Sequence, residues 1–595
     1  MTDAPAHSGD AAVEPEGSTA AERPAGSSLV DAGPVEQVPT RTCWWHRHRP
    51  GPRTWWPLLV LVVADVIVWA RVALPHFATL RLSNPGDSES FAFYMAWNLH
   101  ALTHVMNPFH TPFLYAPYGE DLSNGITMPV IGVLVSPVTA IWGGTAGYNA
   151  AFLLGMFTAA WAVFLLAREF TGNAVGGTMA GLLMMVSPYL LGHSLGHLNL
   201  LWVFGLPYLA YLVIRLYRGA ISRGWAAAGI GLMFFVTAGA STELTATQTV
   251  FAAIAFVVAL IFLPPAGRRR LLHTLPTLLL GGVIGVVLAS PIIYVAFRGG
   301  RPLVSPTAPG HYSTDLTNLL TATGQNQLKL GQRIASLARF QSNFTENTAY
   351  IPIPLLIFLL VYALLRRTRL TTGLLVFAVI ALILSFGPEL PINGTRTIPM
   401  PWALFMKLPA LDAVLPNRFS CFVFIALLVV VADAWVAVRK MPRAITAVAV
   451  VVSFLLLYPS ATKSGFPVDA ANEQFVTSGR LPAHIDPGEN VLVLPGGQNG
   501  PGMRWVEASR FYFRTATGNG GGGKTPVGLL DPTARAIFHA NLKYDYPAAL
   551  VPYLAKIGVR QVFVPASFPK WKQAMDRALP VPARRIDDVW LYELP

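Results

Sequence analysis

The chain has 595 residues, of which 53% are hydrophobic and 12% are charged, and its formal net charge is +13. In soluble proteins about a quarter of all residues are charged, so this composition excludes an ordinary soluble fold. The basic residues are gathered in short segments between long apolar runs, which is typical of membrane proteins and argues against nucleic-acid binding. The two cysteines, Cys43 and Cys421, support neither a disulfide framework nor a cysteine-based metal site.

The N-terminal residues 1–54 are expected to be a disordered cytoplasmic tail. Residues 1–40 are rich in Ala, Gly, Pro, Ser and Glu and contain few large apolar side chains, too few to compensate the entropy lost on ordering. About 55 polar residues precede the first apolar run and no small-residue cleavage pattern opens the chain, so we expect no cleavable signal. The first span should then remain as an anchor.

Residues 55–460 are predicted to form an all-α polytopic transmembrane bundle. A helix needs about 20 apolar residues to cross the hydrocarbon core, where backbone groups must be satisfied internally. About eleven segments meet this requirement. Asp65 and Asp433 lie inside two of them and are expected to make interhelical hydrogen bonds. The segments are residues 56–74, 148–167, 174–190, 199–214, 224–240, 246–264, 275–296, 351–366, 372–387, 419–438 and 443–459.

The segment TMPVIGVLVSPVTAIW at 127–142 decides the predicted topology. It contains Pro129 and Pro137, is short for a span, and suits an interfacial or re-entrant helix. If it does not span, every basic cluster between spans falls on one side of the membrane, which the positive-inside rule makes the cytoplasm. These clusters are Arg41/Arg47/Arg49/Arg53, Arg168, Arg215/Arg218/Arg223, Arg268/Arg269/Arg270, Arg366/Arg367/Arg369 and Arg439/Lys440/Arg443.

With this topology the opposite side receives four loop regions and everything after residue 460. Residues 461–595 change to a mixed composition, with candidate strands at Asn490–Leu494, Val559–Val564 and Asp588–Tyr592. We therefore expect an extracytoplasmic α/β domain at the C-terminus. Its GNGGGG run at 518–523, followed by Lys524, lacks the spacing of a phosphate-binding loop and is interpreted as a flexible loop.

The first outward loop, residues 75–147, is too long and too patterned for a plain connector. The acidic pair Asp87 and Glu89 precedes an aromatic stretch from Phe91 to Val105 with helical periodicity, and an Asn-Pro turn follows. Loops of this length are usually functional or disordered, and the periodicity argues against disorder. We expect an ordered loop that lies along the membrane.

These features resemble the glycosyltransferase C superfamily, whose members take sugars from polyprenyl-phosphate carriers. The shared arrangement is a first span, a long outward loop with an early acidic residue, a jaw-like aromatic helix and a Pro-containing half-helix. SPYLLGHSLGH at 187–197 lies at the position of the superfamily's second functional loop. HYSTDL at 311–316, PNRF at 416–419 and the outward C-terminal domain are similar to bacterial members of this group. The resemblance implies an inverting sugar transfer.

Asp87 is the candidate catalytic base. Transfer to an acceptor hydroxyl needs a carboxylate that takes or orients the proton as the donor phosphate leaves. The competing interpretation is that Asp87 caps the helix that begins near Ser88. Glu89 is a candidate metal partner of Asp87, with a first-turn helix acid as its alternative. A divalent metal is thus left open, and no other cofactor is indicated.

Five residues are candidates for binding the donor phosphate or the substrate. His193 and His197 would share a helix face, and hydrogen bonding to a phosphate competes with simple interfacial packing. Arg418 lies outside a span where basic residues are rare, so a phosphate or lipid headgroups would be its partner. Glu243, in a polar interruption between spans, is assigned to the cavity. Asp315 is the fifth candidate because it lies in the HYSTDL stretch at 311–316.

The leading functional hypothesis is a membrane glycosyltransferase that uses a polyprenyl-phosphate-type sugar donor and an extracytoplasmic glycan, lipid or protein acceptor. It would reside in the plasma membrane with a cytoplasmic N-terminus. A lipid or polysaccharide transporter is the alternative, but the inverted repeats typical of that class are not visible. A non-catalytic assembly factor for envelope glycans is a third interpretation, because a fold does not fix a function.

Overall fold

The computed structural model describes residues 52–71, 73–82, 87–123, 127–298, 312–322, 326–328, 339–340, 342–343, 345–406, 414–460, 466–467, 474–497, 500–518 and 526–595. The expected N-terminal tail lies outside these ranges, except that residues 52–54 already belong to the first helix. Cys43, Lys524 and most of the glycine run at 518–523 also lie outside the described residues.

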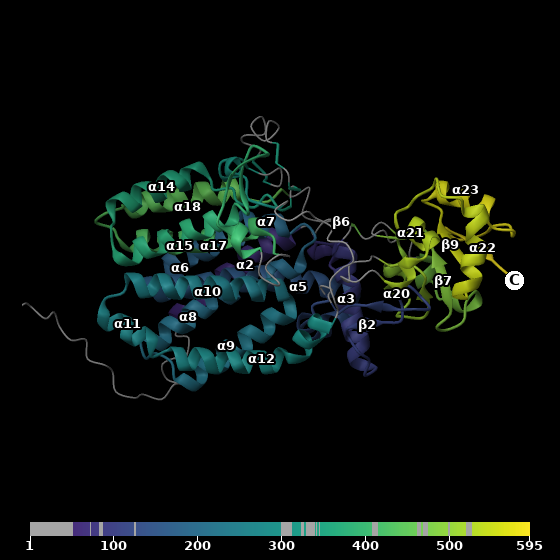
Figure 1. Cartoon of the computed structure of the whole chain (residues 1–595), viewed down its shortest axis with the longest axis horizontal. Coiled ribbons are helices and arrows are strands. Elements are labelled where there is room, and N and C mark those ends of the chain that lie inside the picture. The colour runs from purple at the N-terminus through teal and green to yellow at the C-terminus, as the bar shows by residue number, and fades with distance from the viewer. Residues whose placement is uncertain are drawn as a thin grey trace, which may run out of the picture. The chain divides into compact units, whose positions relative to one another are not determined.

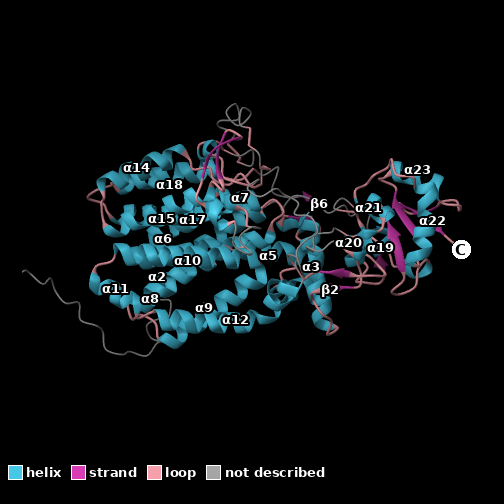
Figure 2. Cartoon of the chain, in the orientation of Figure 1, coloured by secondary structure: helices cyan, strands magenta, loops and turns pink. Residues whose placement is uncertain are grey.

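Helices make up most of the described chain before residue 460 (Figure 1; cyan in Figure 2). Each segment that the sequence predicts as a span overlaps one of them. They are α2 (Pro52–Asp65), α3 (Asp87–Thr103), α4 (Pro129–Leu134), α5 (Ser136–Thr171), α6 (Ala174–Met185), α7 (Pro188–His193), α8 (Gly205–Tyr217), α9 (Arg223–Ala240), α10 (Thr242–Phe262), α11 (Pro265–Leu272), α12 (Leu275–Arg298), α14 (Ile353–Leu365), α15 (Arg369–Ser385), α16 (Trp402–Phe405), α17 (Ser420–Val436) and α18 (Arg443–Leu457).

Six stretches of the described chain are long and apolar enough to cross a membrane, and four shorter helices are also apolar. The expectation of a helical membrane protein is confirmed, while the count of about eleven spans stays a prediction. The six long stretches are Ser136–Thr171, Ala174–His193, Leu198–Tyr217, Thr242–Phe262, Pro265–Arg298 and Pro416–Val436, and the shorter ones are Trp55–Ala70, Ile353–Leu365, Arg369–Ser385 and Arg443–Leu457.

The segment 127–142 is broken into short helical pieces. Helix α4 begins with Pro129 and ends at Leu134, and α5 begins after Val135 with Pro137 in its first turn. Within α5, Gly143 has a φ of 83° and a ψ of 177°, which interrupts the helix before it continues to Thr171. Proline lacks the amide donor of a helix interior, and a positive φ favours glycine. The prolines and Gly143 therefore divide this region into α4, a short first part of α5, and the long remainder of α5.

Helix α17 is the buried centre of the bundle and packs against α5, α6 and α15. Near its end, Asp433 accepts hydrogen bonds from Tyr362 at 2.7 Å, from Arg366 at 3.0 Å and from Thr371 at 3.2 Å. These donors belong to or border α14 and α15, so the expected interhelical role of Asp433 is confirmed. Asp65 is buried as well, but its Oδ1 has no hydrogen-bond partner within the described ranges.

The C-terminal residues form a five-stranded sheet in the order β10-β11-β9-β7-β8 (magenta in Figure 2). Strand β7 is parallel to β8 and β9, whereas β11 is antiparallel to both β9 and β10. The three candidate strands of the sequence coincide with β7, β9 and β11. The strands are β7 (Asn490–Val493), β8 (Arg514–Thr515), β9 (Gln561–Pro565), β10 (Arg584–Ile586) and β11 (Val589–Glu593), and the helices are α19 (Gln474–Thr477), α20 (Gly502–Ala508), α21 (Pro532–Phe538), α22 (Tyr546–Ile557) and α23 (Pro569–Ala578).

The first loop is bonded to this C-terminal region. Thr515 of β8 donates its amide to the Phe113 carbonyl at 2.9 Å, and Ala116 donates its amide to the Thr515 carbonyl at 3.0 Å. The Gly144 amide, just after the break in α5, donates to Glu507 Oε1 of α20 at 2.8 Å. The loop that carries the acidic pair is thus held by residues more than 350 positions later in the chain.

Candidate functional site

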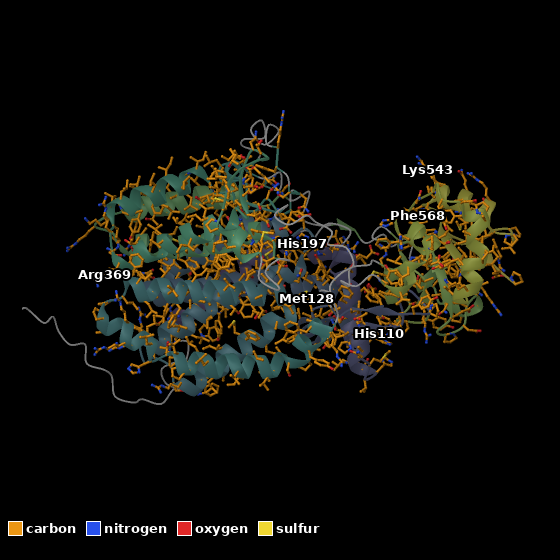
Figure 3. All side chains as sticks on the ribbon, in the orientation of Figure 1. His110, Met128, His197, Arg369, Lys543 and Phe568 are labelled. Atoms are coloured by element: carbon orange, nitrogen blue, oxygen red, sulfur yellow. The ribbon has the colours of Figure 1, made fainter. Side chains whose placement is uncertain are left out.

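Six polar residues meet where several helices begin or end, and we call this set the acid–base cluster. Asp87 is the first residue of α3, His193 is the last of α7, and His197 follows it closely. Figure 3 labels His197 within the helical part of the chain. The members are Asp87, His193, His197, Glu243 at the start of α10, Glu346 before α14, and Arg418 in the turn Pro416–Phe419 before α17.

Arg418 is held between two carboxylates. Its Nη2 donates to Glu346 Oε1 at 2.6 Å and its Nε donates to Glu346 Oε2 at 3.2 Å, a side-on bidentate pair. Its remaining nitrogen, Nη1, donates to Glu243 Oε2 at 2.5 Å. Asn417 donates from Nδ2 to Glu346 Oε2 at 2.9 Å. Charge-assisted bonds of this kind are roughly twice as strong as neutral ones, so Glu346 and Arg418 are firmly oriented.

Glu346 is ionised in spite of its burial, because only 2% of its side chain is exposed yet its neighbours are cationic or hydrogen-bond donors. Burial by itself would raise the pKa of this carboxyl. The Arg418 guanidinium, with smaller contributions from His193 and His197, outweighs the burial and holds the pKa of Glu346 well below its usual range. The cluster therefore keeps a permanent negative charge next to Arg418.

His197 lies between two carboxylates. Its Nε2 is 3.7 Å from Asp87 Oδ2, and its Nδ1 is 3.8 Å from Glu346 Oε1. The same Nδ1 is 3.0 Å from Nδ1 of His193, which is fully buried. Burial lowers the pKa of His197, although Glu346 opposes that effect. One of the two facing Nδ1 atoms must donate and the other must accept, so the two rings are linked by one N–H···N hydrogen bond.

The sequence-predicted residues separate into two groups in the structure. Asp87, His193, His197, Glu243 and Arg418 come together in the cluster. Glu89 turns instead toward Arg81, with 3.8 Å between Glu89 Oε2 and Arg81 Nη1, and burial raises its pKa. Asp315 accepts the backbone amides of Thr317, Asn393 and Gly394, so its carboxylate stabilises a loop.

The structure adds Glu346 and Asn417 to the candidate site. Glu346 belongs to the loop 297–350 and lies shortly before a predicted span, and Asn417 directly precedes Arg418. A signal was present, because an outward arginine beside the membrane needs an acidic partner on the same side. Several acids satisfy that condition, and only the folded loop selects Glu346.

Three members of the cluster have the donor atoms of a metal site. One ligand atom from each of His193, His197 and Glu346 lies within 4.8 Å of the others, and two imidazoles with a carboxylate suit Zn²⁺. However, Arg418 Nη2 is 2.6 Å from Glu346 Oε1, so a divalent cation would compete with a guanidinium for the same carboxylate. As arranged, the cluster does not fit a metal well, and its positive charge is supplied by Arg418.

Comparison with known proteins gives matches in structure only. No protein-family model matches the chain, and no curated protein matches it. The oligosaccharyltransferase AglB from Archaeoglobus fulgidus, in complex with an inhibitory peptide and a dolichol-phosphate, is 13% identical with a TM-score of 0.51, over 90% of this chain and 72% of that one.

Two further structures are similar at lower TM-scores. ArnT from Cupriavidus metallidurans, bound to undecaprenyl phosphate, is 12% identical with a TM-score of 0.46, over 91% of this chain and 98% of that one. The arabinofuranosyltransferase AftD from Mycobacteria is 14% identical with a TM-score of 0.49, over 86% of this chain and 36% of that one. The likeness to AglB shows that the chain shares the fold of that protein, in agreement with the fold expected from the resemblance of the first loop.

Proposed function

We propose that the chain is a membrane glycosyltransferase that moves a sugar from a polyprenyl-phosphate-linked donor to an acceptor hydroxyl outside the cytoplasm. The observation that carries this proposal is the acid–base cluster, which combines a half-exposed carboxylate with an arginine side chain of which only 13% is exposed. The side chain of Asp87 is 40% exposed, so an acceptor can reach it. AglB, which has the same fold, is described with a bound dolichol-phosphate.

In the proposed reaction Asp87 takes the proton of the acceptor hydroxyl. The acceptor oxygen forms a new bond to the anomeric carbon of the sugar, and the bond between that carbon and the phosphate oxygen breaks. The electron pair of the broken bond stays on the phosphate, which leaves on its lipid carrier. Attack from the side opposite the leaving group inverts the anomeric carbon, as the superfamily resemblance implies.

Arg418 is proposed to stabilise the charge that grows on the departing phosphate. A guanidinium presents several donors in a fixed plane, which suits a phosphate oxygen. Glu346 and Asn417 are positioning residues, because Glu346 holds the Nε and Nη2 edge of Arg418 and Asn417 donates to Glu346, which leaves Nη1 directed toward Glu243. The plane of the guanidinium is thereby fixed before the donor arrives.

His197 is proposed to orient Asp87. If His193 donates its Nδ1 proton to Nδ1 of His197, the proton of neutral His197 lies on Nε2, the atom that faces Asp87 Oδ2. The opposite tautomer would place a bare nitrogen of His197 against Asp87, whereas in this one the bare nitrogen is His193 Nε2, 3.9 Å from Glu346 Oε2. In the proposed tautomer His197 keeps Asp87 near the cluster without neutralising it.

The remaining features concern the surroundings of the site. We propose that the chain crosses the plasma membrane about eleven times and that its N-terminus is cytoplasmic. The cluster and the C-terminal α/β region would then face away from the cytoplasm. The C-terminal region is bonded to the first loop through Phe113, Ala116 and Gly144, so it is well placed to present the acceptor near Asp87.

The test is sugar transfer from synthetic polyprenyl-phosphate sugars by the purified full chain in detergent. Asp87→Asn should lower the rate about a hundredfold or more, because positioned bases contribute factors of that size. Asp486→Asn, an exposed aspartate of the C-terminal region, is the matched control and should keep the wild-type rate. Full activity in the Asp87 variant would remove this residue from the mechanism, and no transfer by the wild type from any such donor would contradict the function.

A further inference from the structure

The charge on Arg418 is balanced by two carboxylates in the arrangement described above. Glu346 takes Nε and Nη2, and Glu243 takes Nη1, so all three nitrogens of the guanidinium face a carboxylate. Two carboxylates around one guanidinium leave the group with an excess of negative charge. An arriving phosphate, itself an anion, would be repelled unless one carboxylate withdraws.

The two carboxylates are held very differently. Glu346 is 2% exposed, makes two bonds to Arg418, and accepts a further bond from Asn417. Glu243 is 28% exposed, and within the described chain its carboxylate bonds only to Arg418 Nη1. If Glu346 withdrew from Arg418, its own carboxylate would remain buried without a charged partner. Glu243 can instead turn toward solvent and be hydrated. Glu243 is therefore the carboxylate that can release Arg418.

The position that Glu243 vacates suits a phosphate oxygen. Its Oε2 lies 2.5 Å from Nη1, in the place where an oxyanion of a ligand would accept the same hydrogen bond. The bonds from Glu346 occupy Nε and Nη2, so the departure of Glu243 frees the bond from Nη1 for one phosphate group. Glu243 also lies in the first turn of α10, where an acid is favoured by the helix dipole in either orientation.

We propose that Glu243 is a built-in competitor of the donor phosphate, occupying Nη1 of Arg418 in the empty enzyme and yielding it to the single phosphate of a polyprenyl-phosphate carrier. This inference rests on the function proposed above. The same exchange acts after transfer, because the returning carboxylate displaces the spent carrier. Glu243 thus weakens binding of the carrier and speeds its release.

The test measures binding of sugar-free decaprenyl phosphate to the full chain in detergent, with inorganic phosphate and decaprenol as parallel ligands. Glu243→Gln removes the competing charge and should tighten decaprenyl phosphate about tenfold, which corresponds to about 1.4 kcal/mol. Decaprenol binding should not change. Glu243→Ala should show the same gain, which covers the case in which the glutamine variant does not fold.

Two further variants separate competition from a general change of charge. Glu169→Gln neutralises a carboxylate that pairs with Arg215 and Arg218, outside the cluster, and should bind like the wild type. Glu346→Gln loosens Arg418 and should bind decaprenyl phosphate no better than the wild type. In turnover, Glu243→Gln should lower KM for the donor and also lower kcat where carrier release limits the rate, a split that a purely structural role would not produce.

The outcomes distinguish this inference from the proposed function. If the wild type binds decaprenyl phosphate and both Glu243 variants bind it equally or more weakly, Glu243 is not a competitor, while the donor class stands. If the folded wild type and both variants bind no decaprenyl phosphate, the donor class and the inference fail together. A gain for inorganic phosphate alone would show that the site serves a free anion and not a lipid carrier.

Discussion

Arg418 shows why the chemistry of one side chain matters more than its charge. It bonds simultaneously to Glu346 through Nε and Nη2 and to Glu243 through Nη1. A lysine has one compact ammonium group and cannot reproduce a planar fork of donors. The orientation of the site therefore depends on the guanidinium.

Arg418→Lys should retain the charge and lose most of the function. We expect the KM for a polyprenyl-phosphate sugar to rise and kcat to fall, with a combined loss in kcat/KM of about a hundredfold, because one donor of an anion-binding site contributes about 3 kcal/mol to the transition state. The measurement is steady-state transfer in detergent. Arg535→Lys, in the C-terminal region, is the control, and similar kcat/KM values for the two variants would contradict a specific role for the guanidinium.

The sequence predicts the site at the level of residue types but not of partners. An acid after the first span, two histidines four residues apart and an arginine outside a span are visible from their places between apolar runs. That Glu89 turns to Arg81, that Asp315 caps a loop and that Glu346 meets Arg418 depends on side-chain directions set by folded loops. No periodicity encodes these directions, so Glu89 and Asp315 lie outside the cluster although their sequence context suggested them, and Glu346 could not be singled out.

At the scale of single elements, the hairpin of β2 (His110–Thr111) and β3 (Glu120–Asp121) holds a buried acid. Glu120 is 1% exposed, and its Oε1 has no hydrogen-bond partner in the described chain. Burial, with a smaller effect of neighbouring Asp121, raises the pKa of Glu120 to about 8. The folded protein therefore binds a proton at Glu120 over a pH range in which the unfolded chain has released it.

This difference predicts the direction of a pH effect on stability. Between the ordinary glutamate pKa near 4.5 and about 8, the folded state holds more protons at this site than the unfolded state, so stability falls as pH rises. Glu120→Gln removes the titration and should raise the free energy of unfolding at pH 8.5, relative to the wild type, by about 1–3 kcal/mol, with little difference near pH 4.5.

The measurement is the apparent midpoint of thermal unfolding in detergent at several pH values. Glu389→Gln, an exposed glutamate in the hairpin of β4 (Glu389–Ile392) and β5 (Thr395–Pro399), serves as the control and should show no gain at high pH. Parallel pH curves for the wild type and Glu120→Gln would show that Glu120 is ionised in the folded protein.

The break in α5 at Gly143 is stabilised by a contact with a distant residue, and this contact can be tested by mutation. Gly144 follows the break, its amide donates to Glu507 Oε1 at 2.8 Å, and a Cβ at this position would lie 2.4 Å from the Ala92 carbonyl of α3. Glu507 thus acts like a helix cap supplied by a distant segment. Because α3 carries Asp87 and packs against Gly144, this contact supports the loop that carries Asp87.

Glu507→Ala should loosen this support. Loss of a cap costs about 1 kcal/mol, so we expect faster amide hydrogen exchange just after Gly143 and a severalfold lower transfer rate. Glu507→Gln keeps an acceptor oxygen and should restore most of the protection. The readout is hydrogen exchange of peptides that cover residues 143–150, and unchanged exchange in the alanine variant would mean that the break is held by packing alone.

Hydropathy predicts the helices well because each apolar run is local and long, and every predicted span overlaps a helix. The three candidate strands likewise coincide with β7, β9 and β11. What the sequence could not provide is the pairing of Phe113 and Ala116 with β8, or the contact of Glu507 with Gly144. These contacts join segments hundreds of residues apart, and no local pattern records them.

Members of the acid–base cluster and basic residues lie at opposite ends of α10 and of α17. Glu243 begins α10, which leads to Arg268, and Arg418 precedes α17, which leads to Arg439. Helix α10 has 21 residues, and at about 1.5 Å per residue it is long enough to separate its ends by the thickness of a membrane. Figure 3 labels Arg369 and His197 toward opposite ends of the helical bundle.

The positive-inside rule then predicts that Arg268 and Arg369 lie in the cytoplasm, and that the cluster and its first loop lie on the other side. The C-terminal region must share that side because it is bonded to the first loop through β8 and Glu507. In a variant without the two native cysteines, Lys543→Cys should react with a membrane-impermeant thiol reagent in intact cells, and Arg269→Cys should react only after lysis. Both positions are exposed in the structure, so burial would not explain a missing signal. The reverse pattern would invert the orientation and place Asp87 and its acceptor in the cytoplasm.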